Sequence, residues 1–157
     1  MSAQSIYDQA PIGALIRYSD GTPRPPQRFK HKLAAWENNN NVGRFVRKAG
    51  SRTIGNHTTP ASFTLHQGDF GSAGVVVLKV FKTFSASSPL TFTVVERPKP
   101  GMVRVLDRAG EDAELLHLAA DRSAAQSWLA SHRYSGAVLD VVIDDDAVSG
   151  SGEGRAA

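Results

Sequence analysis

The stretch YSDGTPRPPQRFKHKLAAWENNNNVGRFVRKAGSR, residues 18–52, combines a helix signal, a polar linker and a concentration of positive charge. Two prolines stand just before an apolar pattern, and proline fits the first turn of a helix because its missing N–H has no partner there. The run of asparagines at 38–41 ends the pattern, since Asn competes for backbone hydrogen bonds. We predict a helix near residues 26–38. Three side chains recur along one of its faces and are expected in the core: Phe29, Leu33 and Trp36.

Positive charge is concentrated in the same stretch. Residues 22–52 carry eight basic side chains and a single acid, Glu37. Lys and Arg neutralise phosphates and release counterions, which gives sequence-independent affinity for DNA or RNA. The alternative is a solvated helix face whose cations only keep the domain soluble. The predicted nucleic-acid contacts, with Phe45 as the candidate for base stacking, are Arg24, Arg28, Lys32, Arg44, Phe45, Arg47, Lys48 and Arg52.

The amino-acid composition excludes several other classes of protein. The 157 residues suit one domain with a hydrophobic core, and the absence of cysteine excludes disulfides and thiolate chemistry. No run approaches the ~20 apolar residues of a membrane helix. The first twenty residues lack the basic start and apolar run of a signal peptide, so we expect a cytoplasmic protein without a membrane partner. Twelve Arg against six Lys, with abundant Ala, favour a bacterial source.

Short apolar runs joined by turns predict the rest of the fold. Most of these turns are too short for a parallel crossover. A second helix is expected near 122–133, capped by Asp121 or by Ser123, which has capping-box spacing with Gln126. One face of this helix is expected to carry Ala125, Trp128, Leu129 and His132. The result is an α+β domain on a mainly antiparallel, curved sheet, either a sandwich or a half-open barrel. About eight short strands are expected, at 12–18, 42–48, 61–67, 75–84, 90–96, 102–106, 113–119 and 137–143.

The domain organisation follows from the same patterns. Residues 1–10 are expected to be flexible, and residues 11–143 to form a single α+β domain. Within it, residues 49–60 are expected to form a polar loop. Residues 144–157 are acidic and then rich in Gly and Ser, which is typical of a disordered tail.

Signals of catalysis are weak. No two of the five histidines have zinc-ligand spacing, so we expect no metal, and no motif indicates a cofactor. Asp69-Phe70-Gly71 copies a kinase triplet, but the other kinase motifs are missing and a turn is favoured. His66 and His117 lie on predicted strands and, with Asp69, are the candidates for an acid–base pair.

Three functions therefore remain open. The leading prediction is a non-enzymatic module that binds nucleic acid through the basic surface at residues 24–52. The second is a protein-binding accessory or inhibitor factor that uses a sheet edge or the acidic C-terminal region. From residue 107 onward, that region has ten acids against four bases. The third is an enzyme whose site is assembled from scattered residues. The pattern does not indicate an oligomeric state.

Overall fold

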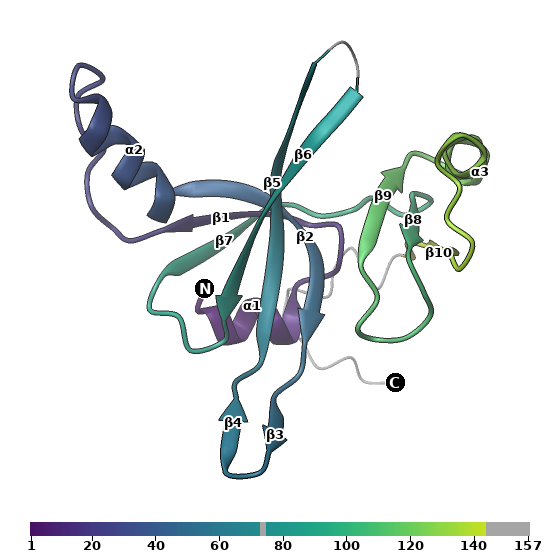
Figure 1. Cartoon of the computed structure of the whole chain (residues 1–157), viewed down its shortest axis with the longest axis horizontal. Helices are drawn as coiled ribbons and strands as arrows, with labels where there is room; N and C mark the ends of the chain where they lie inside the picture. The colour runs from purple at the N-terminus through teal and green to yellow at the C-terminus, as the bar shows by residue number, and fades with distance from the viewer. Residues whose placement is uncertain (73–74, 144–157) are drawn as a thin grey trace.

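The computed structural model describes residues 1–72 and 75–143, which contain three helices and ten strands (Figure 1). The helices are α1 (Ala3–Gln9), α2 (Lys30–Asn39) and α3 (Arg122–His132). The strands are β1 (Leu15–Ser19), β2 (Asn41–Ala49), β3 (Arg52–Ile54), β4 (His57–Thr59), β5 (Ser62–Ser72), β6 (Val75–Ser85), β7 (Thr91–Glu96), β8 (Val103–Leu106), β9 (Leu115–Ala119) and β10 (Val138–Val141).

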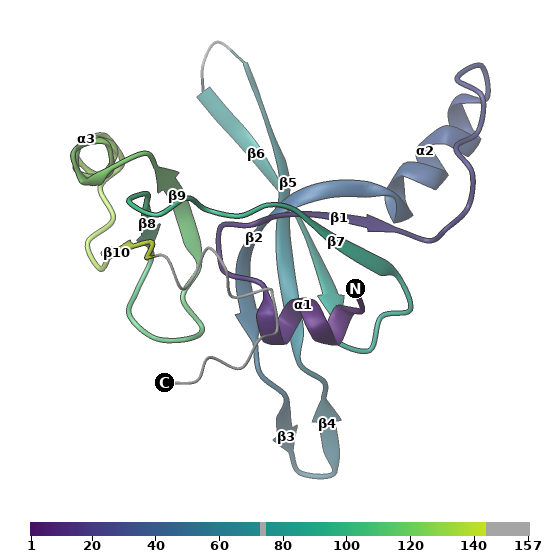
Figure 2. The ribbon, with the colours of Figure 1, turned by 180° about the vertical axis from the view of Figure 1, so that it is seen from behind.

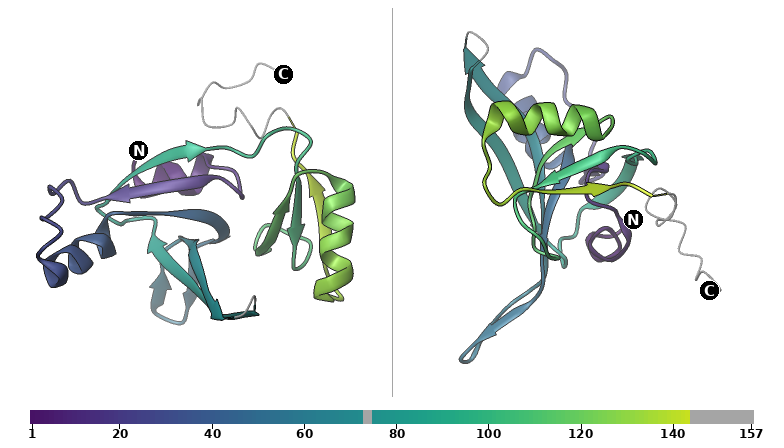
Figure 3. Two further views of the ribbon diagram at one scale, coloured as in Figure 1. Left: turned by 90° about the horizontal axis from the view of Figure 1, so that it is seen from above. Right: turned by 90° about the vertical axis from the view of Figure 1, so that its right-hand side faces the viewer.

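The strands form three antiparallel sheets. The largest has five strands in the order β6-β5-β2-β1-β7, so β6 and β7 are its edges and it is not closed into a barrel. A three-stranded sheet, β10-β8-β9, lies beside one end of the first sheet (Figures 1 and 3). β3 and β4 form a separate hairpin in the segment expected to be a polar loop. The predicted α+β class with mainly antiparallel strands is confirmed.

Aromatic side chains build the core of the five-stranded sheet on the face that α1 covers (Figure 2). Side chains alternate between the two faces of a strand, and each of the five strands places one aromatic side chain on this face. Phe63 stacks on Phe84 with ring centroids 5.6 Å apart and meets Phe92 edge-on at 5.3 Å. Phe45 lies 5.8 Å from Phe63 and is fully buried. These ring contacts add specific geometry to the hydrophobic burial that stabilises the sheet.

The N-terminus is ordered, so the expectation that residues 1–10 are flexible is wrong. Ser2 caps α1 by accepting a hydrogen bond from the backbone N–H of Ser5 (3.1 Å), and Ala3 and Ile6 are fully buried. The backbone of Met1 exchanges hydrogen bonds with Phe92 at the edge of the sheet. The helix has only seven residues, too few for its apolar spacing to be decisive in the sequence.

The three-stranded sheet has its own core, against which α3 packs. Asp121 caps α3 through the N–H of Ala124 (2.8 Å), one residue from the predicted start. Ala125 is buried among strand valines, with Trp128 and Leu129 packed against this core, as the apolar face predicts. Within the described residues, no helix has the length and apolar character needed to cross a bilayer.

We predict that Phe45→Ala lowers the free energy of unfolding by about 3–5 kcal/mol, because it opens a cavity among the aromatic rings. Chemical denaturation measures this. The matched control is Phe81→Ala, since the Phe81 side chain is 44% exposed and should contribute less than about 1 kcal/mol. Equal losses in the two variants would contradict the placement of Phe45 in the core.

Candidate functional site

The basic arm, defined here as residues 20–39, projects from the body of the protein (Figures 1 and 2). It consists of the loop that follows β1 and of α2, which has no buried residue. The loop runs back along the helix, and the Trp36 indole Nε1 donates a hydrogen bond to the Thr22 carbonyl (3.0 Å). The arm is thus held by its own loop instead of by the hydrophobic core.

This arrangement corrects the prediction that the aromatic face of the helix is buried in the core. Phe29 is 41% exposed, and Leu33 and Trp36 are half-buried. The guanidinium of Arg28 lies 4.8 Å from the Phe29 ring centroid, and the Lys32 ammonium lies 5.2 Å from it. Cations over an aromatic face keep both groups at the surface. Periodicity in the sequence therefore identified a real stripe but not the partner that it faces.

A single buried amide fixes the base of the arm. The side-chain oxygen of Asn40 accepts hydrogen bonds from the Ser19 hydroxyl (2.7 Å) and from the Asp20 backbone N–H (3.1 Å). Its side-chain nitrogen donates to the Trp36 carbonyl (2.8 Å) and to the Asp20 carboxylate (3.0 Å). Asn40 thus joins the end of β1 to the end of α2. It also confirms that the asparagine run ends the helix.

Asp20 completes this network. Its carboxylate accepts hydrogen bonds from the Thr22 hydroxyl (2.6 Å) and the Thr22 backbone N–H (2.9 Å). These bonds, together with the one from Asn40, hold the pKa of the Asp20 carboxyl below its usual value. The carboxyl is therefore ionised at neutral pH, and the loop that leaves β1 is pinned to α2.

The structure divides the eight predicted contacts among separate places. Arg24, Arg28 and Lys32 are exposed on the arm. Arg52 lies on the β3–β4 hairpin, which projects from the body in a different direction from α2 (Figure 1). The other four predicted contacts lie on β2, within the body. The eight residues do not form one surface.

The residues on β2 serve the body of the protein. Phe45 is 0% exposed, so its predicted role as a base-stacking residue is wrong. Arg44 Nη1 donates to the Gly13 carbonyl (2.7 Å), and Lys48 Nζ donates to the Tyr7 carbonyl (3.4 Å). The Arg47 Nε is buried, with no hydrogen-bond partner among the described residues. Alternation along β2 gave no hint of this burial, because a bulge between Phe45 and Arg47 shifts the register.

Two further cations belong with the arm. Lys30, which was not among the predicted contacts, is exposed in the first turn of α2. The ammonium of Lys82, on β6, donates to the Asn38 carbonyl at the end of α2. Residues 38 and 82 are too far apart in the chain for any sequence spacing to bring them together.

A notch of about 350 Å³ lies where the arm meets the sheet. Its walls come from β1, the end of α2 and the start of β2. The side chain of Arg17 is exposed on β1, and those of Trp36 and Val42 are half-buried. The residues that line this notch are Arg17, Tyr18, Ser19, Trp36, Asn40, Asn41 and Val42.

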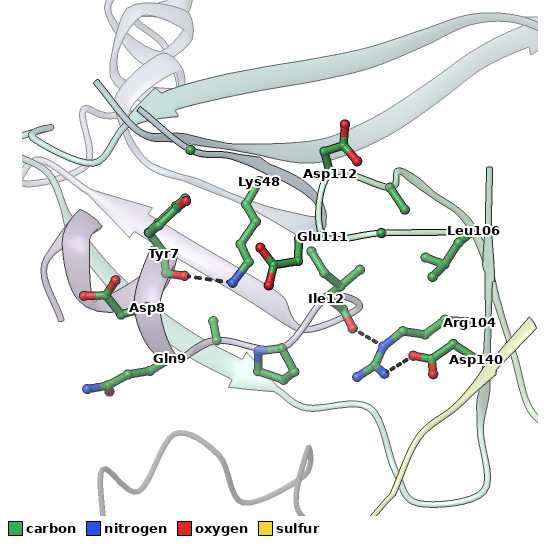
Figure 4. A pocket seen from close by; sticks show the side chains of 15 residues that line it. Tyr7, Asp8, Gln9, Ile12, Lys48, Arg104, Leu106, Glu111, Asp112 and Asp140 are labelled. Carbon is green, nitrogen blue, oxygen red and sulfur yellow. Dashed lines mark hydrogen bonds and ion pairs between the residues drawn. The ribbon is translucent and has the colours of Figure 1, made fainter. Parts of the chain in front are cut away.

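A larger, charged cavity of about 760 Å³ lies between α1, the end of β2 and the three-stranded sheet (Figure 4). Arg104, only 5% exposed, donates from Nε to the Ile12 carbonyl (2.7 Å) and from Nη1 to Asp140 (2.8 Å). The Lys48 ammonium lies against the Tyr7 carbonyl, with the Glu111 carboxylate nearby. Both cations of this cavity are thus engaged within the protein, and Arg104 joins the three-stranded sheet to the segment that precedes β1.

The two candidate histidines line the same cavity, a third one of about 360 Å³ between the sheets. Arg44 pairs with His66 in the ladder, and Arg44 and Glu96 each pair with Leu15, so all three side chains share one face. His117 enters the same cavity from β9. Such a set of groups can hold a small anion or exchange a proton. The side chain of Asp69 lies outside the described residues.

His117 also forms part of a ring stack on the three-stranded sheet. Its imidazole lies parallel to the Trp128 indole with centroids 5.0 Å apart, and His132 stacks on Trp128 at 4.0 Å. Burial and the charge of His132 lower the pKa of His117. The neutral imidazole is therefore the form that the fold favours. Metal-ligand clusters are absent from residues 1–72 and 75–143.

Residues 1–146 match the model of a family described as uncharacterised conserved protein UCP036055, and the chain belongs to that family. Neither a curated protein nor a solved structure matches the chain.

We predict that Asn40→Ala loosens the basic arm, because groups of Ser19, Asp20 and Trp36 lose their shared partner. The half-buried Ser19 hydroxyl and Trp36 carbonyl should each cost about 1–3 kcal/mol when left unsatisfied. Brief trypsin treatment of the folded protein should then cut faster between residues 24 and 32. Asn39→Ala is the matched control because Asn39 is exposed. Equal cleavage of the two variants would show that Asn40 does not hold the arm.

A second prediction concerns pH. The pKa of His117 is lower in the folded chain than in the unfolded chain, so the unfolded state takes up its proton first as the pH falls. The contribution of neutral His117 to the free energy of unfolding should be fully present above about pH 7. It should decrease as the pH falls below the unfolded pKa of about 6.5. In His117→Gln the decline from pH 7 to pH 5 should be smaller. An unchanged pH profile of thermal unfolding would contradict this assignment.

Proposed function

We propose that this member of the family described as uncharacterised conserved protein UCP036055 binds nucleic acid, in the cytoplasm, through the phosphate backbone. The contacts are the cations of the basic arm: Arg24, Arg28, Lys30 and Lys32. One observation carries the proposal. In the described part of the chain, these four cations project from the body without an ion pair to any carboxylate.

The construction of α2 supports an anionic partner. Its first turn holds Lys30 and Lys32 and no acid, and Phe29 at the N-cap makes no side-chain capping bond. Positive charge at a helix N-terminus opposes the helix dipole and costs stability. A helix that keeps such a disfavoured arrangement in the open is suited to bind an anion, whose charge would relieve the repulsion.

The arm also suits the shape of a nucleic-acid strand. Its ten-residue helix stands clear of the sheets, so its sides can approach a backbone without interference from the body (Figures 1 and 3). Lys and Arg on such a helix contact phosphates without reading bases. The cations of β2 do not take part, because their hydrogen bonds and burial commit them to the body. The contact surface is therefore smaller than the sequence indicated.

We predict binding with a steep dependence on salt. Four phosphate contacts should weaken the affinity about 50-fold for a single strand, or about 150-fold for a duplex, between 50 and 200 mM salt. Fluorescence anisotropy with labelled oligonucleotides measures this. The variant Arg24→Glu/Arg28→Glu/Lys32→Glu should lose more than about 100-fold at low salt.

The control for this variant reverses three cations elsewhere: Arg52, Lys99 and Arg122, which are all exposed. It makes the same change in net charge and should retain most of the affinity. The proposal fails if the control loses as much as the arm variant, or if no DNA or RNA is retained at low salt. A partner whose binding survives high salt would instead favour the protein-binding hypothesis. Part of the acidic C-terminal region invoked by that hypothesis, residues 144–157, lies outside the described residues.

A further inference from the structure

The notch at the base of the basic arm has features that phosphate binding does not require. Trp36 and Val42, both half-buried, contribute apolar lining, and the exposed Arg17 lines the notch as well. Its volume of about 350 Å³ lies at the lower end of the range for small-ligand pockets, roughly 300–1,000 Å³. The notch thus has room for one flat ring system beside the row of cations.

The indole is fixed in place before any ligand arrives. Trp36 Nε1 donates to the Thr22 carbonyl, and the Trp36 carbonyl accepts a bond from Asn40. An aromatic ring held from both its backbone and its edge loses little conformational entropy when another ring stacks on it. Stacking of a base on such a ring contributes about 1–3 kcal/mol and tolerates any base, because every base has a π-face.

The polar groups of the notch indicate how the ligand is recognised. The Asn40 amide is saturated by its own network, and the Asn41 side-chain oxygen accepts from the Val42 backbone N–H (2.8 Å). Ser19 donates to Asn40. Hydrogen bonds within the protein thus occupy these groups, whereas Arg17 has no ion pair among the described residues. Recognition therefore comes from stacking and charge, without a preference for base sequence.

We propose that this notch takes one unpaired base, so that the protein binds single-stranded nucleic acid in preference to a duplex. The proposal rests on the proposed function of the arm. A strand whose phosphates follow the arm cations places one base against Trp36, and Arg17 contacts the phosphate next to it. A duplex must first unstack and unpair that base, which costs a few kcal/mol. Single strands should therefore bind at least about tenfold more tightly than duplexes.

The test uses the full chain with Trp128→Phe, which leaves Trp36 as the sole tryptophan of the two. Fifteen-nucleotide oligo-dT, oligo-rU and a fifteen-base-pair duplex are titrated at low salt. Both single strands should quench the Trp36 emission to saturation and bind at least about tenfold more tightly than the duplex. Single strands of other base composition should bind with similar affinity.

A second variant blocks the notch and keeps Trp36 in place. Val42→Phe fills the notch and leaves every arm cation in place, so single-strand affinity should fall about tenfold while duplex binding is unchanged. The matched control is Val95→Phe, the same substitution at a valine exposed on β7. Circular dichroism checks that both variants fold.

The outcomes separate this inference from the proposed function. Equal affinity for single strands and duplex without Trp36 quenching overturns the notch proposal and leaves the arm proposal standing. If the protein binds none of the oligonucleotides, both the notch proposal and the arm proposal are overturned. The notch could instead hold a second copy of the chain. Light scattering would then show a dimer, and the Trp36 emission would not respond to oligonucleotides; this result also overturns the notch proposal.

Discussion

The buried amide of Asn40 is the constraint on which the geometry of this protein depends. It lies where β1, α2 and β2 meet, and it satisfies groups from β1, from the loop that follows β1 and from α2. Without it, the Trp36–Thr22 bond and the Lys82–Asn38 bond are the hydrogen bonds from outside the helix that would remain, among the described residues, to fix the direction of a helix with no buried residue. Because a buried polar group must find partners, the junction has one favoured arrangement, and the basic arm points away from the sheets.

Much of the fold follows from local pattern. Alternation of apolar side chains placed the strands, and Asp121 and the apolar face of α3 placed the second helix. The pattern did not show which partner a side chain faces, or whether a strand continues through glycines. The stripe of Phe29, Leu33 and Trp36 is real, but it faces its own loop instead of a core. The glycines near residue 70 suggested a turn, yet β5 continues through Ser72 because Gly in a strand accommodates bulges.

The candidate site was less predictable than the fold, for a physical reason. The sequence gives the number of basic residues. Whether their side chains point to solvent or into the body depends on strand register, bulges and hydrogen bonds. Arg44, Arg47 and Lys48 are as basic as the arm residues, but β2 turns them toward the body. His66 and His117, which the sequence placed on two separate strands, line one cavity between the sheets. The notch beside Trp36 has no signal in the sequence, since β1, α2 and β2 each contribute to it.

The central claim is that a preformed basic arm, and not the whole basic third of the chain, is the contact surface for nucleic acid. Titration of ¹⁵N-labelled protein with a single-stranded oligonucleotide, followed by backbone amide chemical shifts, tests it most directly. The account predicts shifts concentrated at residues 22–42 and at Arg17 and Lys82, with the β3–β4 hairpin and the three-stranded sheet unchanged. Shifts centred on residues 44–52, or none at all, would contradict it.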